Sequence, residues 1–325
     1  MRVLVVGGSG HIGTFLVPRL VRAGHDVTSM SRGTRKAYSD SPEWQQVTQV
    51  VVDREQQDID GTFGATVLAQ HPDVVIDLLS FTIESTTALV ETIRGQVGHL
   101  VHCGSLWRYG PSIKLPISEG EGTPAIDEYG TQKEMIAQYL KRETASGGLV
   151  TTSVHPGHIV GPGWHPTGVL GNTNPETWAD ISAGRTLRIP GSGAESMHHV
   201  HADDVAQVFE LAATHRDAAA GEDFHAVAAH ALNVRGYATI AAGWFGQQAT
   251  LESITWDEFR SITTPEFAED SWGHLQRNHV LSIEKSRALL GYAPAWEPED
   301  AILESVSWLI EHGKLSVENP LIGKL

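Results

Sequence analysis

The sequence predicts an α/β protein, in which a doubly wound parallel sheet is followed by a smaller, mixed domain towards the C-terminus. Two observations indicate this fold. In the first half of the chain, short runs rich in β-branched residues alternate with longer segments of helical composition, which is the pattern of successive βαβ units. After residue 156 the alternation stops, and the segment PGHIVGPGWHPTG is rich in glycine and proline. Such a composition predicts a long loop rather than another βα unit.

The strands are expected where apolar runs are bounded by turn residues. Right-handed crossovers would place these runs in one sheet. The runs lie at 2–6, 25–31, within 44–53, and at 73–80, 99–105 and 148–157, and a further strand is expected at 222–229. Helices are expected at 11–23, at 128–146 and at 202–215, where Asp203 or Asp204 is suited to the N-cap.

Composition and charge exclude several classes of protein. With 325 residues, 41% of them hydrophobic, the chain can form one large domain or two closely packed ones. No apolar run approaches the roughly 20 residues of a membrane span, and the start MRVLVVGG lacks the features of a secretory signal. A formal charge of −16 opposes binding to nucleic acid and to anionic membranes, so we expect neither partner. The single cysteine, Cys103, suits a cytoplasmic location.

The segment VVGGSGHIG carries glycines at 7, 10 and 13, directly after a predicted strand and before a predicted helix. Glycines at this spacing permit a tight turn and let the backbone approach a pyrophosphate at the helix N-terminus. The segment therefore predicts dinucleotide binding by a Rossmann-type fold, with Gly7, Gly10, His11, Ile12 and Gly13 at the cofactor. We expect this domain to span 1–160 with a return segment at about 194–230, and the substrate-binding region to comprise 161–193 and 231–325.

The end of the second strand bears on the choice between NAD and NADP. Proteins that bind NAD usually carry an acidic residue there, which accepts hydrogen bonds from the adenosine ribose. This chain has Ser31-Arg32-Gly33, with Arg35 and Lys36 close behind. A guanidinium can bind a 2′-phosphate through charge and paired hydrogen bonds. We therefore expect NADP to be preferred, with NAD as the alternative.

Tyr129 and Lys133 are four residues apart on a predicted helix and so share one face. An ammonium group near a phenol favours the phenolate and lowers the pKa of the tyrosine, which makes it a usable acid or base. Ser105 ends a predicted strand of the sheet. This combination indicates a catalytic site at the edge of the sheet.

With these residues the chain resembles the extended short-chain dehydrogenase/reductases, the family of NAD-dependent epimerases and dehydratases. The resemblance rests on segments spread over most of the chain: GGSGHIG, GSLWRYG, YGTQK, HPGHIVGPG, HVHADDVA and SIEKSRALLGYAP. It implies that Ser105 binds the substrate oxygen, that Tyr129 transfers the hydroxyl proton, and that Lys133 binds the nicotinamide ribose. It also implies a homodimer formed through helices at about 84–95 and 129–146.

The resemblance implies further contacts with the cofactor and the substrate. Asp53 would hold the adenine amino group. The segment Leu78, Leu79 and Ser80 would lie along the cofactor, although Leu79 is bulkier than the small residues common there, and Pro156, His158 and Ile159 would lie near the nicotinamide. Candidate substrate contacts are Trp107, His165 and His199.

The segment SMHHVHADD (196–204) gathers histidines and aspartates that could in principle bind a transition metal. A nicotinamide enzyme needs no metal, so we expect none, and we expect histidines that either border the substrate cleft or are structural. Family members that act on nucleotide sugars commonly carry an arginine just upstream, where this chain has Met197, and a second arginine where it has His155. A thioether cannot neutralise a phosphate.

The sequence thus predicts an NAD(P)-dependent oxidoreductase or epimerase that moves a hydride between nicotinamide and a hydroxyl or carbonyl carbon of a sugar-like small molecule. Two alternatives stay open. One is a nucleotide-sugar 4-epimerase or dehydratase. The other is a non-catalytic NAD(P)-binding regulatory protein.

Overall fold

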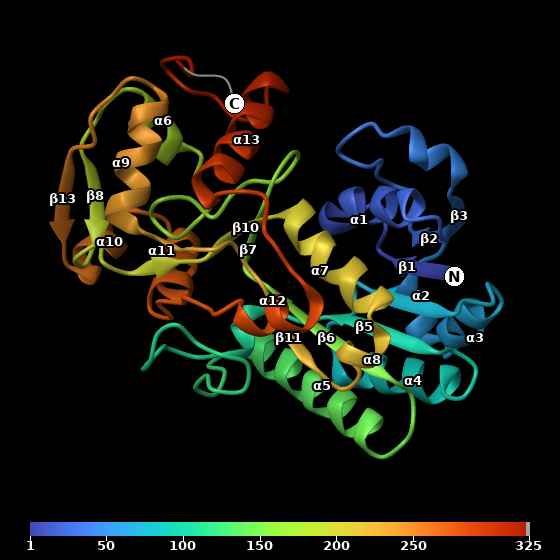
Figure 1. Cartoon of the computed structure of the whole chain (residues 1–325). Coiled ribbons are helices and arrows are strands. Elements are labelled where there is room, and N and C mark those ends of the chain that lie inside the picture. The colour runs from blue at the N-terminus through green and yellow to red at the C-terminus, as the bar shows by residue number, and fades with distance from the viewer. Residues whose placement is uncertain (323–325) are drawn as a thin grey trace.

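A parallel sheet of seven strands forms the centre of the protein, which a computed structural model describes over residues 1–322 (Figure 1). The strand order is β11-β6-β5-β4-β1-β2-β3. From β1 the chain moves outward to β3, then returns to β4 beside β1 and moves outward the other way. This order confirms the predicted doubly wound fold. The strands are β1 (Arg2–Val6), β2 (Asp26–Ser31), β3 (Thr48–Val51), β4 (Val74–Asp77), β5 (His99–Cys103), β6 (Thr151–Pro156) and β11 (Asp223–Ala226).

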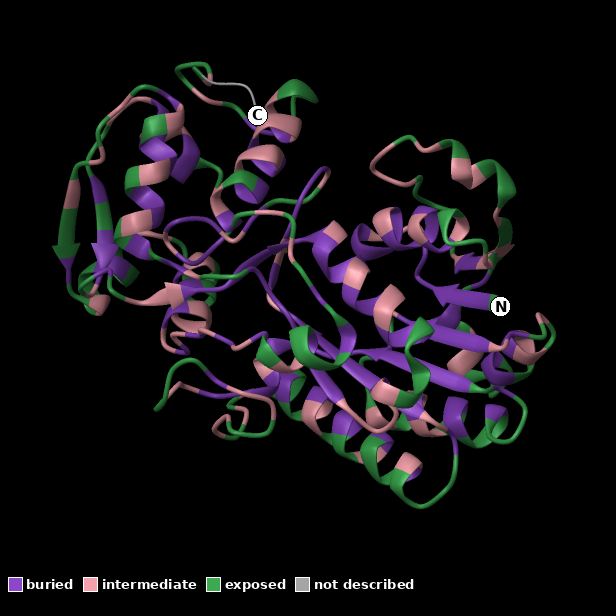
Figure 2. Cartoon of the chain, in the orientation of Figure 1, coloured by how far each residue is buried: buried purple, intermediate pink, exposed green. Residues whose placement is uncertain are grey.

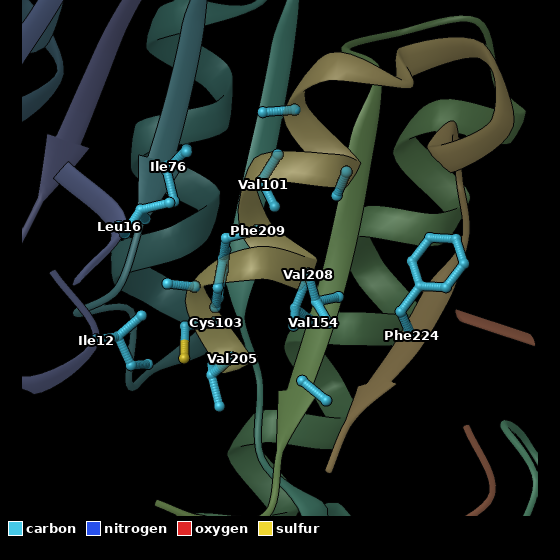
Figure 3. Packing of buried hydrophobic residues seen from close by; sticks show 14 of the residues in the cluster. Ile12, Leu16, Ile76, Val101, Cys103, Val154, Val205, Val208, Phe209 and Phe224 are labelled. Carbon is cyan, nitrogen blue, oxygen red and sulfur yellow. The ribbon is translucent and has the colours of Figure 1, made fainter. Parts of the chain in front are cut away.

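Helices cover both faces of the sheet, and the alternation of side chains along each strand supplies a core to each face. On one face Val3 and Val5 of β1 join a cluster with Leu16, Val154 and Phe209 (Figure 3). This face is covered by α1 (His11–Arg22) and α7 (Ala202–Thr214), which pack on each other. On the other face Leu4 and Val6 join a second cluster beneath α3 (Phe63–Leu68), α4 (Ile83–Ile93) and α5 (Glu128–Ala145). Short elements between these strands are η1 (Pro42–Gln46), α2 (Arg54–Ile59) and η2 (Leu106–Arg108).

The rest of the chain forms a smaller lobe with its own core, which includes Trp178, Met197 and Tyr237. Its strands pair in twos, β8 with β13 and β9 with β12, so it has no large sheet of its own. Figure 2 shows buried inner faces and exposed outer faces on its helices. The elements are α6 (Glu176–Ser182), β8 (Leu187–Pro190), β9 (Ser196–Met197), β12 (Leu232–Asn233), α9 (Val234–Trp244), β13 (Leu251–Ile254), α10 (Trp256–Ile262), α11 (Pro265–Leu275) and α13 (Pro298–Glu311).

The two parts of the chain exchange elements. Strand β9 lies in the expected return segment of the first domain but pairs with β12 in the smaller lobe. In the opposite sense α12 (Glu284–Leu290) packs on β11, α7 and α8 (Arg216–Ala219) of the first domain. Between them β7 (His158–Val160) pairs with β10 (His199–His201). Each part is therefore held in place by segments from the other.

Helix α7 begins differently from the prediction. Its N-cap is His201, whose Nδ1 accepts the N–H of Asp203 at 2.9 Å. The aspartates have other partners: Asp203 pairs with Arg19 at 2.6 Å, and Asp204 accepts the N–H groups of Ala295 and Trp296. The prediction that Asp203 or Asp204 caps the helix was wrong, because these long-range partners take up both carboxylates. No helix within residues 1–322 is both long and apolar enough to cross a bilayer.

Many histidines are buried within these cores. Burial lowers the pKa of His11, His198 and His225 to about 3. It lowers the pKa of His99, His155, His199 and His279 to about 4. These rings are therefore neutral in the folded protein at neutral pH.

We predict steep acid destabilisation from these histidines. In the unfolded chain each has a pKa of about 6.5, so between pH 6.5 and 4 the unfolded state binds more protons and stability rises with pH. Each such histidine lowers the free energy of unfolding by up to about 1.4 kcal/mol per pH unit as the pH falls through this window. Thermal unfolding at pH 7, 6 and 5 should show Tm dropping sharply, with most of the loss below pH 6.5. A Tm that stays flat from pH 7 to pH 5 would contradict this account.

Candidate active site

The turn between β1 and α1 has the geometry of a phosphate-binding loop. Gly7 has φ of +86°, a conformation that favours glycine, and the N–H of Gly10 donates to the carbonyl of Gly7 at 2.9 Å. A Cβ on Gly13 would lie 2.2 Å from the carbonyl oxygen of Gly8, so only glycine lets the helix pack this closely on the turn. The N-cap of α1 is Gly10, which has no side chain to occupy the first N–H groups. These groups fit a pyrophosphate.

Of the predicted cofactor contacts outside the turn, Leu79 lies directly against it. A Cβ on Gly7 would lie 2.9 Å from Leu79, so Leu79, which is 38% exposed, forms a wall beside the turn, with Leu78 next to it. Asp53 is exposed at the end of β3, and one of its oxygens already caps α2 by accepting the N–H of Gln56 at 3.2 Å. Ile12 packs in the core below the turn.

Arg32, Arg35 and Lys36 are all exposed in the loop after β2. Among the ion pairs of the described part of the chain, none includes these three residues. The loop turns at Gly33, which has φ of +68°. The three positive charges are therefore not neutralised by neighbouring carboxylates.

An aromatic group covers the start of α1. The ring of His11 stacks on Trp164 with centroids 4.9 Å apart and planes within 10°. Tyr38, from the loop after β2, lies edge-on to His11 at 6.0 Å and directly over Gly163, where a Cβ would lie 1.9 Å from its ring. Sequence reasoning did not find Tyr38 and Trp164, because they come from two loops that only the fold brings together.

Ser105, Tyr129 and Lys133 lie together at the carboxyl edge of the sheet. Ser105 follows β5 and is buried; its Oγ accepts the N–H of Trp107 at 3.1 Å. Lys133 is 1% exposed, and its Nζ donates to the carbonyls of Ser80 at 2.6 Å and of Cys103 at 2.8 Å. The same ammonium lies 5.7 Å from the centroid of the Tyr129 ring. Helix α5 carries both residues and is capped by Asp127, which accepts the N–H of Gly130 at 2.7 Å.

The ionisation of Tyr129 differs from the sequence-based expectation. Burial of its hydroxyl end raises the pKa of Tyr129 to about 12, although the residue as a whole is 41% exposed. A hydrogen bond with Ser105 lowers this pKa in part. Burial therefore outweighs the lowering expected from Lys133, whose ammonium donates to the two carbonyls. At neutral pH Tyr129 therefore carries its proton.

A group of aromatic and imidazole side chains continues from Tyr129 into the smaller lobe. Trp107 lies 6.3 Å from the Tyr129 ring and 4.9 Å from His274 of α11. His274 Nδ1 is 2.8 Å from His158 Nε2, and the rings of His158 and His199 are 5.4 Å apart. This arrangement brings the predicted residues Trp107, His158 and His199 together. Sequence reasoning missed His274, whose helix carried no recognisable motif.

The remaining predicted residues lie around this group or apart from it. Pro156 ends β6 in a buried position, and Ile159 is half-buried in β7. His165 is an exposed residue on the loop after β7. Its pKa is lowered, first by the partial burial of its ring and second by the charge of Lys314. Among the contacts of residues 1–322, none joins His165 to the group around Tyr129.

The arginines that could bind a substrate phosphate have other partners. Arg277 lies 3.9 Å above the Trp107 ring and pairs with Asp127. Arg185 pairs with Asp180 and Glu318, and Arg188 pairs with Glu252. Arg235 donates to the carbonyl of Ser192 and to the hydroxyl of Ser253. Met197 is fully buried in the core of the smaller lobe.

The histidines of segment 196–204 have protein partners. His198 accepts the N–H of Leu281 through Nδ1, and its Nε2 lies 3.0 Å from the carbonyl of Ala228. His199 Nε2 lies 2.9 Å from the carbonyl of Thr167, and His201 Nε2 lies 2.6 Å from Glu304. Within residues 1–322, no three His, Cys, Asp or Glu side chains are arranged so that they could hold a metal ion.

Comparison with known proteins supports a common origin. Residues 3–226 match the model of the NAD dependent epimerase/dehydratase family. The 2′-dehydrokanamycin reductase of Streptomyces kanamyceticus is 30% identical over 71% of this chain and 63% of its own length. A UDP-glucose 4-epimerase of Mycolicibacterium smegmatis is 27% identical over 96% of this chain and 98% of its own.

A solved structure shows the same fold at lower identity. The UDP-glucose-4-epimerase of Stenotrophomonas maltophila, with bound NAD and formylated UDP-arabinopyranose, superposes with a TM-score of 0.72. It is 18% identical, and the match covers 97% of this chain and 99% of that one. The family match and the relatives agree with each other. The chain belongs to the NAD-dependent epimerase/dehydratase family and is an NAD(P)-dependent enzyme of the extended short-chain dehydrogenase/reductase type.

Proposed function

We propose that the enzyme reduces a carbonyl carbon of a sugar-like small molecule, with Ser105, Tyr129 and Lys133 as its catalytic residues. The observation that carries this proposal is the meeting of these three side chains at the carboxyl edge of the sheet. A protonated phenol is poised to donate. Tyr129 gives its proton to the substrate oxygen as the carbonyl becomes a hydroxyl.

The other two residues support this proton transfer. The Oγ of Ser105 accepts the N–H of Trp107 and hydrogen-bonds with Tyr129. When a substrate is bound, the single hydroxyl proton of Ser105 would be donated to the same substrate oxygen. Lys133, held by the carbonyls of Ser80 and Cys103, would bind the nicotinamide ribose, as the resemblance implies. The nicotinamide supplies the hydride when it is bound.

Gly7, Gly10, His11, Ile12 and Gly13 would hold the pyrophosphate of the cofactor, with Leu78, Leu79 and Ser80 along it. Asp53 would contact the adenine, and Pro156, His158 and Ile159 the nicotinamide. NADP is the proposed cofactor because Arg32, Arg35 and Lys36 have no carboxylate partner in the ion pairs of the described chain. A 2′-phosphate would supply that partner.

We infer a substrate without a phosphate group. Met197 is buried where nucleotide-sugar enzymes commonly carry an arginine, and Arg185, Arg188 and Arg277 are already paired with carboxylates. Trp107 and His274, whose ring is neutral at pH 7, offer an aromatic and hydrogen-bonding surface, which suits hydroxyl groups. A relative whose name denotes reduction of a dehydro-aminoglycoside agrees with this class. Relatives named UDP-glucose 4-epimerase match over nearly the whole chain, so epimerisation is the second candidate.

We also propose a cytoplasmic homodimer. A groove of about 260 Å³ on the outer face of α4 and α5 is lined by Ile83, Met135 and Tyr139, among others, and Met135 is 44% exposed. The resemblance places the dimer contact on these helices. The buried, reduced Cys103 suits the cytoplasm.

Absorbance at 340 nm tests the reaction class. A panel of oxidised sugars and aminoglycosides, with NADPH, should include a substrate that consumes the cofactor; epimerisation without net loss of NADPH would instead support the second candidate. Tyr129→Phe should lower kcat by about 10²–10⁴-fold, because the proton donor is lost. The Kd of NADPH should change by less than about threefold. In the control Tyr139→Phe, on the same helix, kcat, KM and the Kd of NADPH should all change by less than about threefold.

Arg32→Ala tests the cofactor preference. Loss of a charge-assisted hydrogen bond of about 1.5–3 kcal/mol should raise the Kd of NADP by about 10- to 150-fold. The Kd of NAD, which lacks the 2′-phosphate, should barely change. Arg287→Ala, in α12, serves as the control. Equal losses for both cofactors would refute a role for Arg32 in binding the 2′-phosphate.

Met135→Glu tests the dimer. A charge buried in an apolar contact is unfavourable, so the mass measured by light scattering should fall by half relative to the wild type. Leu289→Glu places the same charge at an equally exposed apolar residue of α12 and should leave the mass unchanged. A wild-type protein that is already monomeric would exclude the proposed contact.

A further inference from the structure

A buried polar network lies directly behind Ser105. The backbone N–H of Ser105 donates to Nδ1 of His155 at 3.2 Å. On the far side of the ring, Nε2 lies 3.5 Å from Asp223 and 2.6 Å from the guanidinium of Arg108. His155 is 0% exposed, Arg108 2% and Asp223 6%. None of these three was expected to contribute to the site.

Gly104 leaves the space that the imidazole of His155 needs. A Cβ on Gly104 would lie 2.1 Å from Nδ1 of His155, so the imidazole occupies the space that this glycine leaves open. The ring can then reach the N–H of Ser105 from the adjacent strand. Any other residue at 104 would push the two apart.

Arg108 extends the network to the catalytic helix. Its guanidinium lies 3.2 Å from Asp223 of β11, and its Nε lies 2.5 Å from Glu134 of α5. Glu134 follows Lys133 directly. The side chain of Arg108 therefore connects the end of β5, the outer strands and the helix that carries Tyr129.

The protonation of His155 follows from its neighbours. Burial, and next the charge of Arg108, lower the pKa of His155 to about 4, so the ring is neutral at pH 7. Burial acts to raise the pKa of Asp223, but His155 and Arg108 outweigh it and hold this pKa below its usual range. A neutral imidazole has one accepting nitrogen, yet N–H donors lie against both nitrogens.

The tautomer with the proton on Nε2 satisfies the buried N–H of Ser105 and one oxygen of Asp223. Nδ1 then accepts from Ser105 and Nε2 donates to Asp223, while Arg108, whose nearest nitrogen lies 2.6 Å from Nε2 and cannot donate to it in this tautomer, keeps Asp223 and Glu134 as partners. The opposite tautomer would pair Nε2 with Arg108 but leave the buried N–H of Ser105 facing another donor, which costs free energy.

We propose that His155 and Arg108 are positioning residues for the proposed reduction: the Nε2-protonated His155 fixes the backbone of Ser105, and Arg108 fixes α5 relative to it. Their function is to set the distance between the hydroxyl groups of Ser105 and Tyr129, which share one substrate oxygen. An error of about 1 Å in such a placement can cost about 10²-fold in rate. The inference rests on the proposed function of this site.

Three substitutions at His155 separate positioning from stability. His155→Asn keeps an acceptor near the place of Nδ1, His155→Gln keeps a polar group near Nε2 only, and His155→Leu keeps neither. We expect kcat to fall by about 10²-fold in His155→Leu and His155→Gln but by less than about tenfold in His155→Asn. KM and the Kd of NADPH should stay within about threefold. If all three variants lose kcat equally, in proportion to their loss of Tm, the network is structural only.

Glu134→Gln is a milder variant, because Glu134 is partly exposed and the change conserves its shape. It should lower kcat by about three- to tenfold with little change in Tm, since the charge that anchors Arg108 to α5 is lost. An unchanged kcat would show that the contact of Arg108 with Glu134 does not help to position α5.

The tautomer can be measured without any substrate. Nitrogen-15 NMR of the wild-type protein, with His155 assigned by comparison with His155→Asn, should show an unprotonated Nδ1 and a protonated Nε2 between pH 6 and pH 8. A protonated Nδ1 would overturn the proposal. If the wild-type enzyme reduces no substrate of the panel, the positioning role fails together with the proposed function. If it does, and only the ranking of the His155 variants fails, the proposed function stands alone.

Discussion

The close approach of helix α1 to strand β1, made possible by Gly13, determines where every other part of the site can lie. A side chain at residue 13 would collide with the carbonyl of Gly8, so the helix would have to move away from the turn. Helix α1 in turn packs against α7, and Arg19 of α1 binds Asp203 at the start of α7. The placement of α7 fixes β10 and its histidines. One backbone contact thus aligns the cofactor turn with the smaller lobe.

The carboxyl edge of the sheet buries several polar side chains. Asp77, His102 and Ser153 lie side by side on neighbouring strands. Burying a charge is costly unless it has a partner, and two partners are present: Arg54 binds Asp77, and Arg108 binds Asp223. Lys133 lies between these pairs, and burial lowers its pKa. These buried polar groups find their hydrogen-bond and charge partners only among their neighbours in the protein. They therefore favour a single position of helix α5.

Features that depend on local pattern could be predicted from the sequence. The strands of the sheet follow from runs of β-branched residues, the turn from the glycines at 7, 10 and 13, and the meeting of Tyr129 with Lys133 from helical spacing. Features that depend on distant partners could not. The cap at His201 arises because Arg19 and the backbone near Trp296 engage the aspartates. The pKa of Tyr129 depends on burial, and His274 reaches Trp107 from a helix without a motif.

The uncompensated charges after β2 have a consequence for how a cofactor arrives. A dinucleotide is an anion, and a protein with a formal charge of −16 repels it at long range. Within about one Debye length, roughly 8 Å at physiological salt, the exposed Arg32, Arg35 and Lys36 attract the same anion. With the proposed contacts the encounter would be oriented: the adenosine phosphate would dock first at this small positive area, and the nicotinamide would then move towards Tyr129. Added salt would weaken both the repulsion and the attraction.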